Sequence, residues 1–299
     1  MFQFFANIFG YLLEFLYNLI NNYGIAIILF SVIIKIILLP LSIKQQRTLK
    51  KSTELQDKMK ALQFKYKNNP EKLNQEMMNL YKTENMSPFS GCLTAIVQFI
   101  LLISVFYLVR SPLTFMQKIP ADDINKYVTQ VEEDGRQVSD VYPEIDLIRE
   151  SNWLQEKNPD DESAKKLSLQ MNFLGLDLSK IPQQNMSDYT VYIIPVLYIL
   201  SSFISIRLST SMQAKQNKKS NKETVIDGET GKELITEEEA NEMDTVMQTN
   251  KMMSWMMPIM SISIAFVAPL GLALYWLVSN VLMIAERLVL NKIIKTEEE

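Results

Sequence analysis

The sequence predicts an all-α membrane protein with five transmembrane helices, and two observations lead to this fold class. Hydrophobic residues make up 47% of the 299 residues, and they are gathered into long windows with the charged residues between them. About 20 helical residues cross a hydrocarbon core of about 30 Å. Five windows reach this length, and the expected spans are residues 23–43, 89–110, 189–209, 252–269 and 270–291.

Residues 1–22 are expected to form an amphipathic helix that lies in the membrane interface. Asn7, Glu14 and Asn18 interrupt its apolar run, and Asn21-Asn22 leaves almost no turn before the next span. An additional span is the alternative, because residues 2–20 could cover about 28 Å as a helix. A cleaved signal peptide is not favoured, because no Lys or Arg precedes the apolar run.

The charges of the connecting segments predict the orientation in the membrane. Residues 44–88 carry ten Lys or Arg against five acidic residues, so this segment should face the cytoplasm. Residues 111–188 carry eight basic against fifteen acidic residues and should form an acidic extracellular loop. Five spans then place the N-terminus outside. The loop 210–251 and the tail 292–299 lie in the cytoplasm in this arrangement.

The segment 44–88 has the pattern of a helical hairpin. Apolar residues recur at helical spacing in two stripes, first Leu55, Met59, Leu62 and Tyr66, then Leu73, Met77 and Leu80. Pro70 separates the stripes, so residues 45–67 and 71–81 are expected to form antiparallel helices. This hairpin could be a docking surface or a spacer. In the extracellular loop, DINKYVTQ and DLIRESNWL are helical candidates, and no function is assigned to that loop.

The composition argues against an enzyme. The chain has one cysteine, Cys92, and no histidine, which removes an internal disulfide framework, a zinc cluster and the usual proton shuttle. We expect no catalytic residues, no metal and no cofactor. The formal net charge of -4 is a sum over two aqueous faces, and it indicates no specificity for nucleic acid.

Lys35 stands in the middle of the first expected span. It is nine residues from Lys44, about 13 Å along a helix, which exceeds the reach of a lysine side chain toward the interface. Glu286 is the only carboxylate within the five expected spans, and an ion pair with it is one alternative. The interpretation we favour is a hydrated cavity that extends from the cytoplasm to Lys35.

Polar residues on several expected spans could form the walls of this cavity. On a helical projection, Ser31 and Lys35 fall within a sector of about 40°, and Tyr198, Ser202 and Ser205 share one of about 60°. Packing contacts between helices are the alternative explanation for such small residues. The positions expected to line the cavity are Ser31, Gln98, Tyr198, Ser202, Ser205, Ser261, Tyr275, Ser279 and Asn280.

These residues resemble the YidC/Oxa/Alb family of membrane protein insertases, in particular its Gram-positive-type bacterial members. The similarity runs through all five expected spans. It is carried by YGIAIILFSVIIKIILLPLSIKQQR, SPFSGCLTAIVQFILLISVFYLV, MNFLGLDLS and MPIMSISIAFVAPLGLALYWLVSNVLMIAERLVL. Lys35 stands where the family usually has an arginine, and the last stretch adds Trp276, beside Tyr275, to the expected lining.

The resemblance implies five helices around a hydrophilic groove that is open to the cytoplasm and to lipid, with Lys35 as its positive charge. It implies an insertase and chaperone of the bacterial cell membrane that acts on nascent membrane proteins. The implied partners are these substrates, the lipid bilayer, the ribosome and the Sec translocon. A transporter or channel, with Lys35 as an anion or coupling site, and a scaffold for assembly are the alternatives.

Overall fold

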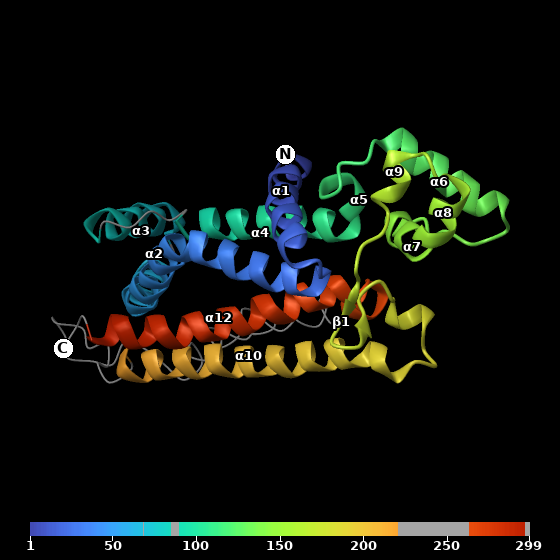
Figure 1. Cartoon of the computed structure of the whole chain (residues 1–299). Helices are drawn as coiled ribbons and strands as arrows, with labels where there is room; N and C mark the ends of the chain where they lie inside the picture. The colour runs from blue at the N-terminus through green and yellow to red at the C-terminus, as the bar shows by residue number, and fades with distance from the viewer. Residues whose placement is uncertain (68, 85–89, 221–262, 297–299) are drawn as a thin grey trace. The chain divides into compact units, whose positions relative to one another are not determined.

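The computed structural model describes residues 1–67, 69–84, 90–220 and 263–296 (Figure 1). The described chain is mostly helical, which confirms the expected predominance of helix. It divides into two compact units, which are described separately. The first unit contains Met1–Ile37, Val97–Ser202 and Ser261–Met283, and the second contains Leu38–Ile96, Phe203–Met260 and Ile284–Glu299.

Three helices among the described residues are long and apolar enough to cross a membrane. They are α2 (Tyr23–Lys65), α10 (Ile193–Ser220) and α12 (Leu270–Thr296), and their candidate spans are Tyr23–Thr48, Tyr189–Leu208 and Leu270–Leu290. These spans correspond to the first, third and fifth expected ones.

The other two expected spans are only partly covered. Helix α4 (Ser90–Arg110) occupies the second and carries a shorter apolar stretch, Phe99–Arg110. The fourth expected span, residues 252–269, lies mostly outside the described residues. In the part that is described, residues 263–267 are helical. A count of five spans therefore stays a prediction.

Helix α1 (Phe2–Ile20) precedes the first span and is not one of the candidate spans. It ends at Asn21, which adopts the left-handed conformation with φ 53° that asparagine tolerates. The side chains of one face are buried, among them Leu13 and Tyr17. The opposite face carries exposed apolar side chains, namely Phe4, Ile8, Tyr11, Phe15 and Leu19. Both faces of the helix thus carry apolar side chains, and its expected amphipathic character and its location in the interface stay predictions.

The buried face of α1 packs on the short helix α5 (Pro112–Phe115). Gly10 makes this approach possible, because a Cβ atom there would lie 1.8 Å from the carbonyl oxygen of Phe115. Lys118 adds polar contacts from its Nζ atom to the backbone oxygen and Oδ1 of Asn7, each 3.2 Å long. The same ammonium lies 3.9 Å from the centre of the Tyr11 ring.

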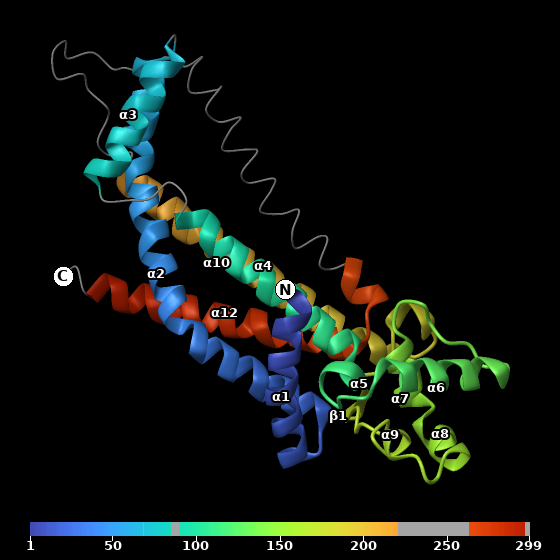
Figure 2. The same cartoon turned by 90° about the horizontal axis from the view of Figure 1, so that it is seen from above.

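The acidic segment, residues 111–188, is folded into short helices and a hairpin (Figures 1 and 2), and many of its apolar side chains belong to the buried core. Beyond α5 its elements are α6 (Ala121–Glu133), α7 (Pro143–Arg149), α8 (Ser151–Lys157), α9 (Glu162–Lys165), β1 (Asn172–Phe173), β2 (Leu176–Asp177) and η1 (Pro182–Gln184). The 3-10 helix η2 (Tyr189–Tyr192) then leads into α10. The first helical candidate lies within α6. The second is divided at Glu150 into α7 and α8.

Glu144 joins α7 to α5 inside this segment. Its buried carboxylate accepts hydrogen bonds from the backbone N–H groups of Leu113 (2.7 Å) and Thr114 (3.0 Å) and from the Thr114 hydroxyl (2.7 Å). These N–H groups begin α5 and have no partner within their own helix. Burial raises the pKa of Glu144 even though the hydrogen bonds oppose that change.

In the second unit, the later part of α2 and helix α3 (Pro70–Thr83) form an antiparallel pair (Figure 2). Asn69 caps α3 by accepting a hydrogen bond from the backbone N–H of Lys72 (3.1 Å), and Pro70 follows at the first helical position. Lys58 contacts Glu84 at 2.7 Å. No side chain of α3 is buried.

Replacing Gly10 with alanine tests the packing of α1 on α5. The added methyl group meets backbone atoms that cannot rotate away, so we expect a loss of about 1–3 kcal/mol in the free energy of unfolding. Thermal unfolding in detergent micelles measures this loss. Asn18→Ala, at an exposed position of the same helix, is the matched control and should leave the unfolding temperature unchanged.

The raised pKa of Glu144 predicts a pH-dependent stability. The folded chain binds this proton more tightly than the unfolded chain, so the stability from Glu144 is present below its ordinary pKa of 4.5 and is lost as pH rises through the raised value. Denaturant titrations between about pH 4 and 8 should show wild type losing stability relative to Glu144→Gln as pH rises. Glu156→Gln, at an exposed site, should show no such trend. An opposite slope would contradict the assignment.

Candidate functional site

Lys35 lies on α2, near the middle of the candidate span Tyr23–Thr48, and its side chain is half-buried. One turn earlier, Ser31 is only 4% exposed and its hydroxyl donates a 2.7 Å hydrogen bond to the Ile27 carbonyl of the same helix. The next two side chains after Lys35, Ile36 and Ile37, are exposed. Ser31 therefore packs inside the first unit, whereas the helix turns an apolar face outward directly after the lysine.

A polar contact joins α10 to α12. The buried Asn280 donates from its Nδ2 atom to the hydroxyl oxygens of Ser201 (3.0 Å) and Ser202 (3.1 Å). The Ser201 hydroxyl in turn donates to the Tyr198 carbonyl at 2.8 Å. Bonds between polar side chains of neighbouring helices fix how membrane helices pack. Ser202 and Asn280 were expected at the site, but Ser201 was missed because it lies outside the polar sector of its helix.

An aromatic contact lies on the same pair of helices. The rings of Tyr198 and Trp276 have their centres 5.9 Å apart at an interplanar angle of 39°. Tyr275 and Ser279, on α12, are half-buried. The structure thus brings together four of the expected site residues, Tyr198, Ser202, Trp276 and Asn280, as one contact between α10 and α12.

The remaining expected residues are placed less completely. Ser205 is buried on the part of α10 that belongs to the second unit. The side chain of Gln98 and the whole of Ser261 lie outside what the structure describes. The groove and the role of Lys35 in it therefore stay proposals.

Backbone contacts fix the ends of α2 and α12 within the first unit. We name residues 170–180 the clasp. The carbonyl of Gln170 accepts from the N–H of Tyr23 (3.0 Å), and the carbonyls of Leu178 and Lys180 accept from Gly271 and Leu270 (both 2.9 Å). The first N–H groups of a helix have no partner within the helix. The clasp supplies carbonyl acceptors for such groups at the start of α2 and at the start of α12. Sequence patterns gave no signal for these contacts.

Comparison with known proteins defines the family. The family model described as "60Kd inner membrane protein" matches residues 15–298, almost the whole chain. The chain belongs to this family. Family membership and the three apolar helices identify a multi-pass membrane protein of the bacterial cell membrane. The family, which corresponds to YidC/Oxa/Alb, is the one that the sequence motifs resembled.

Similar proteins named "Membrane protein insertase YidC" occur in several bacteria. The protein from Treponema denticola is 27% identical over 286 residues, which cover 95% of this chain and 37% of the relative. The Clostridium perfringens protein is 47% identical over 98 residues, covering 33% of this chain and 41% of the relative. The Caldanaerobacter subterraneus protein is 43% identical over 102 residues, which cover 34% of this chain and 50% of the relative. The matches thus span half or less of these relatives.

Substitutions at the contact between α10 and α12 test its contribution. Asn280→Ala removes two interhelical hydrogen bonds, so we expect the free energy of unfolding to fall by about 0.6–2 kcal/mol. Unfolding in mixed detergent micelles measures the change. The double substitution Ser201→Ala with Ser202→Ala, alone and combined with Asn280→Ala, completes a cycle. Strictly additive effects would show that these bonds contribute nothing.

Proposed function

We propose that this protein inserts integral membrane proteins into the cell membrane and helps them fold. The observation that carries the proposal is the family match over residues 15–298, together with relatives that are named membrane protein insertases. No covalent chemistry is needed for this activity. The physical task is to lower the cost of moving polar residues through hydrocarbon.

The proposed working part is a hydrophilic groove among five transmembrane helices, open to the cytoplasm and to lipid. Its positive charge is Lys35, whose place near the middle of a 26-residue apolar span supports this role. A lysine at that depth costs about 2.5–3.5 kcal/mol of insertion free energy, which an ordinary packing position would avoid. Water that reaches Lys35 shortens the apolar distance that a polar tail of the substrate has to cross.

Substrate segments are proposed to move along α10 and α12. Asn280 already holds the hydroxyls of Ser201 and Ser202, and Trp276 is packed on Tyr198, which favours a firm wall at these positions. The half-buried Tyr275 and Ser279 on α12 are then the candidates for direct contact with a substrate. Gln98, Ser205 and Ser261 stay in the proposed lining on the sequence pattern alone.

The proposed orientation has the N-terminus outside and the C-terminus in the cytoplasm. The clasp supports this arrangement, because it binds the first residues of both α2 and α12, as expected for two spans that start on the same side of the membrane. The basic hairpin formed by α2 and α3 is then cytoplasmic, where it can bind an emerging substrate or the ribosome. The Sec translocon remains a partner that the family resemblance implies.

Lysine is not equivalent to the arginine that the family usually has at this position. An ammonium lacks the planar fork that binds a carboxylate through two parallel hydrogen bonds. We therefore propose general electrostatic attraction of acidic tails, without geometric recognition of one carboxylate.

Reconstitution tests the proposed activity. Purified protein in liposomes should move the acidic tail of a single-span substrate to the lumen, where an added protease cannot cut it. Liposomes without the protein provide the baseline. A scaffold would bind the substrate and leave the tail open to digestion, which would overturn the proposal of insertion.

Substitutions of Lys35 test the electrostatic role. Lys35→Arg should keep activity, whereas Lys35→Ala and Lys35→Glu should slow transfer of acidic tails by about tenfold or more, equivalent to about 1.4 kcal/mol. The assay is growth of cells depleted of their own insertase, combined with protease protection of substrates with acidic and neutral tails. Equal growth of all three variants would refute this role.

A matched control moves the charge by one position. Lys35→Ile combined with Ile36→Lys keeps the composition of the span but puts the ammonium on a side chain that is 63% exposed in wild type. If the charge works only from its own helix face, this variant should not restore insertion. Restoration would show that the mere presence of a cation in the span is sufficient.

A further inference from the structure

The clasp contains a hairpin whose turn is unusual for its residue type. Strands β1 and β2 pair antiparallel, with Asn172 opposite Asp177 and Phe173 opposite Leu176. The turn residues Leu174 and Gly175 both have positive φ, 52° and 81°. Such a two-residue turn favours asparagine followed by glycine, because leucine is strained in the left-handed region. The Leu174 side chain is also 87% exposed. Neither its backbone nor its packing therefore explains why leucine is here.

The contacts of the hairpin place it beside the starts of two candidate spans. The Asn22 side chain donates a 2.8 Å hydrogen bond to the carbonyl of Asn172, directly before the candidate span that begins at Tyr23. The Phe173 ring packs on Gly24, where a Cβ atom would lie 2.5 Å from it. On the other side of the hairpin, Leu178 bonds to Gly271 in the first turn of the span that begins at Leu270.

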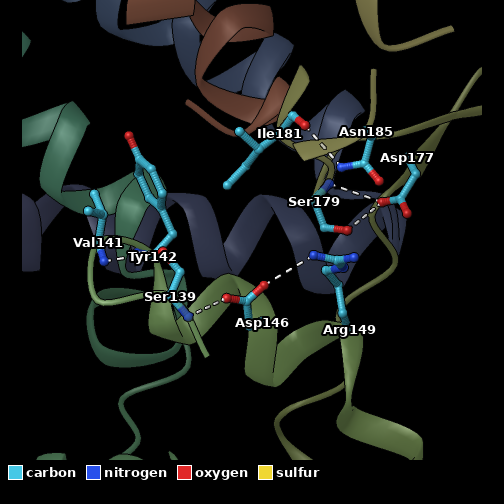
Figure 3. Close-up of polar contacts among 9 residues, drawn as sticks. All are labelled: Ser139, Val141, Tyr142, Asp146, Arg149, Asp177, Ser179, Ile181 and Asn185. Atoms are coloured by element: carbon cyan, nitrogen blue, oxygen red, sulfur yellow. Dashed lines mark hydrogen bonds and ion pairs between the residues drawn. The ribbon is translucent and has the colours of Figure 1, made fainter. Parts of the chain in front are cut away.

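The segment that follows the hairpin reaches the start of the remaining candidate span. Strand β2 packs against η2, whose first residue, Tyr189, begins that span. Figure 3 shows local hydrogen bonds that hold the intervening chain, from Ser179 to Asp177 and from Asn185 to the Ile181 carbonyl. A hydrogen bond from Lys180 (2.7 Å) lowers the pKa of Asp188 to about 2 and fixes the end of this chain.

Two more large apolar side chains are exposed in this region. Met186 is 67% exposed, and Tyr189 is 81% exposed. Leu174 follows Phe173, which packs at the start of the first candidate span, and Met186 lies three residues before Tyr189, where another candidate span begins. Tyrosine is enriched where a bilayer meets water, because its ring is apolar and its hydroxyl is polar. This region of the first unit thus exposes three large apolar side chains near the starts of the candidate spans.

We infer that Leu174, Met186 and Tyr189 insert into the headgroup and upper acyl region of the leaflet at which the three candidate spans begin. The occupant of this surface is the phospholipid bilayer. Contact with lipid explains both the leucine at a position suited to asparagine and its exposure. The hairpin then anchors the clasp, and through the clasp it holds the first residues of α2 and α12 at the same depth. This inference does not depend on the proposed activity.

A fluorescent probe tests the contact. In a Cys92→Ser background, Leu174→Cys is labelled with the fluorophore NBD, and the protein is reconstituted into phosphatidylethanolamine and phosphatidylglycerol liposomes. Lipids with a nitroxide near the headgroup should quench this probe several-fold more than one at Asp160→Cys, an exposed position between α8 and α9. Aqueous iodide should show the reverse order.

Two outcomes would overturn the inference. Quenching by iodide equal to that at Asp160 would place the tip in water. Protection from both iodide and nitroxide lipid would place it against protein, which in these liposomes is a second copy of the chain. Either result excludes the bilayer as the occupant.

Leu174→Asn separates lipid contact from folding. Asparagine suits the left-handed turn, so the thermal stability in detergent should stay equal or increase. An NBD probe at Met186→Cys should nevertheless become less quenched by nitroxide lipids and more by iodide when Leu174→Asn is added. A Met186 probe that does not respond would show that the hairpin tip does not set the depth of its neighbours, and would count against the inference.

Discussion

The structure of the first unit depends on how the first amide groups of its membrane helices find hydrogen-bond acceptors. Tyr23, Leu270 and Gly271 cannot donate within their own helices, and in an apolar environment an amide without a partner costs several kcal/mol. The carbonyls of the clasp accept all three bonds. The same eleven-residue segment, 170–180, therefore fixes where two spans begin and joins them, through Gln170 and Tyr17, to α1.

The fold of the acidic segment follows from a second buried contact. The Glu144 carboxylate accepts hydrogen bonds from the first N–H groups of α5. Helix α5 in turn packs on α1 through the close approach of Gly10 to Phe115. A chain of contacts thus runs from α7 through α5 to the N-terminal helix. The segment that carries fifteen of the 34 acidic residues is consequently an ordered part of the first unit, although its composition resembles that of an exposed loop.

The sequence predicted the elements whose signals are local. The apolar windows indicated α2, α10 and α12, and the stripe of Leu73, Met77 and Leu80 indicated α3. It did not predict the clasp, because carbonyls that accept bonds from residues far away in the chain leave no periodic pattern. Ser201 was missed for a related reason, since only the partner on α12 reveals its role. The α10–α12 contact contains four of the expected site residues, whereas the groove around Lys35 rests on the family and the sequence.

Pro40 lies within α2, five residues after Lys35. Proline has no amide hydrogen, so the Ile36 carbonyl cannot receive the bond that residue 40 would otherwise supply. An acceptor in that situation within hydrocarbon requires another donor, and a water molecule is the smallest one available. The backbone itself thus leaves an acceptor one residue beyond the lysine that a water molecule or a neighbouring polar side chain can satisfy.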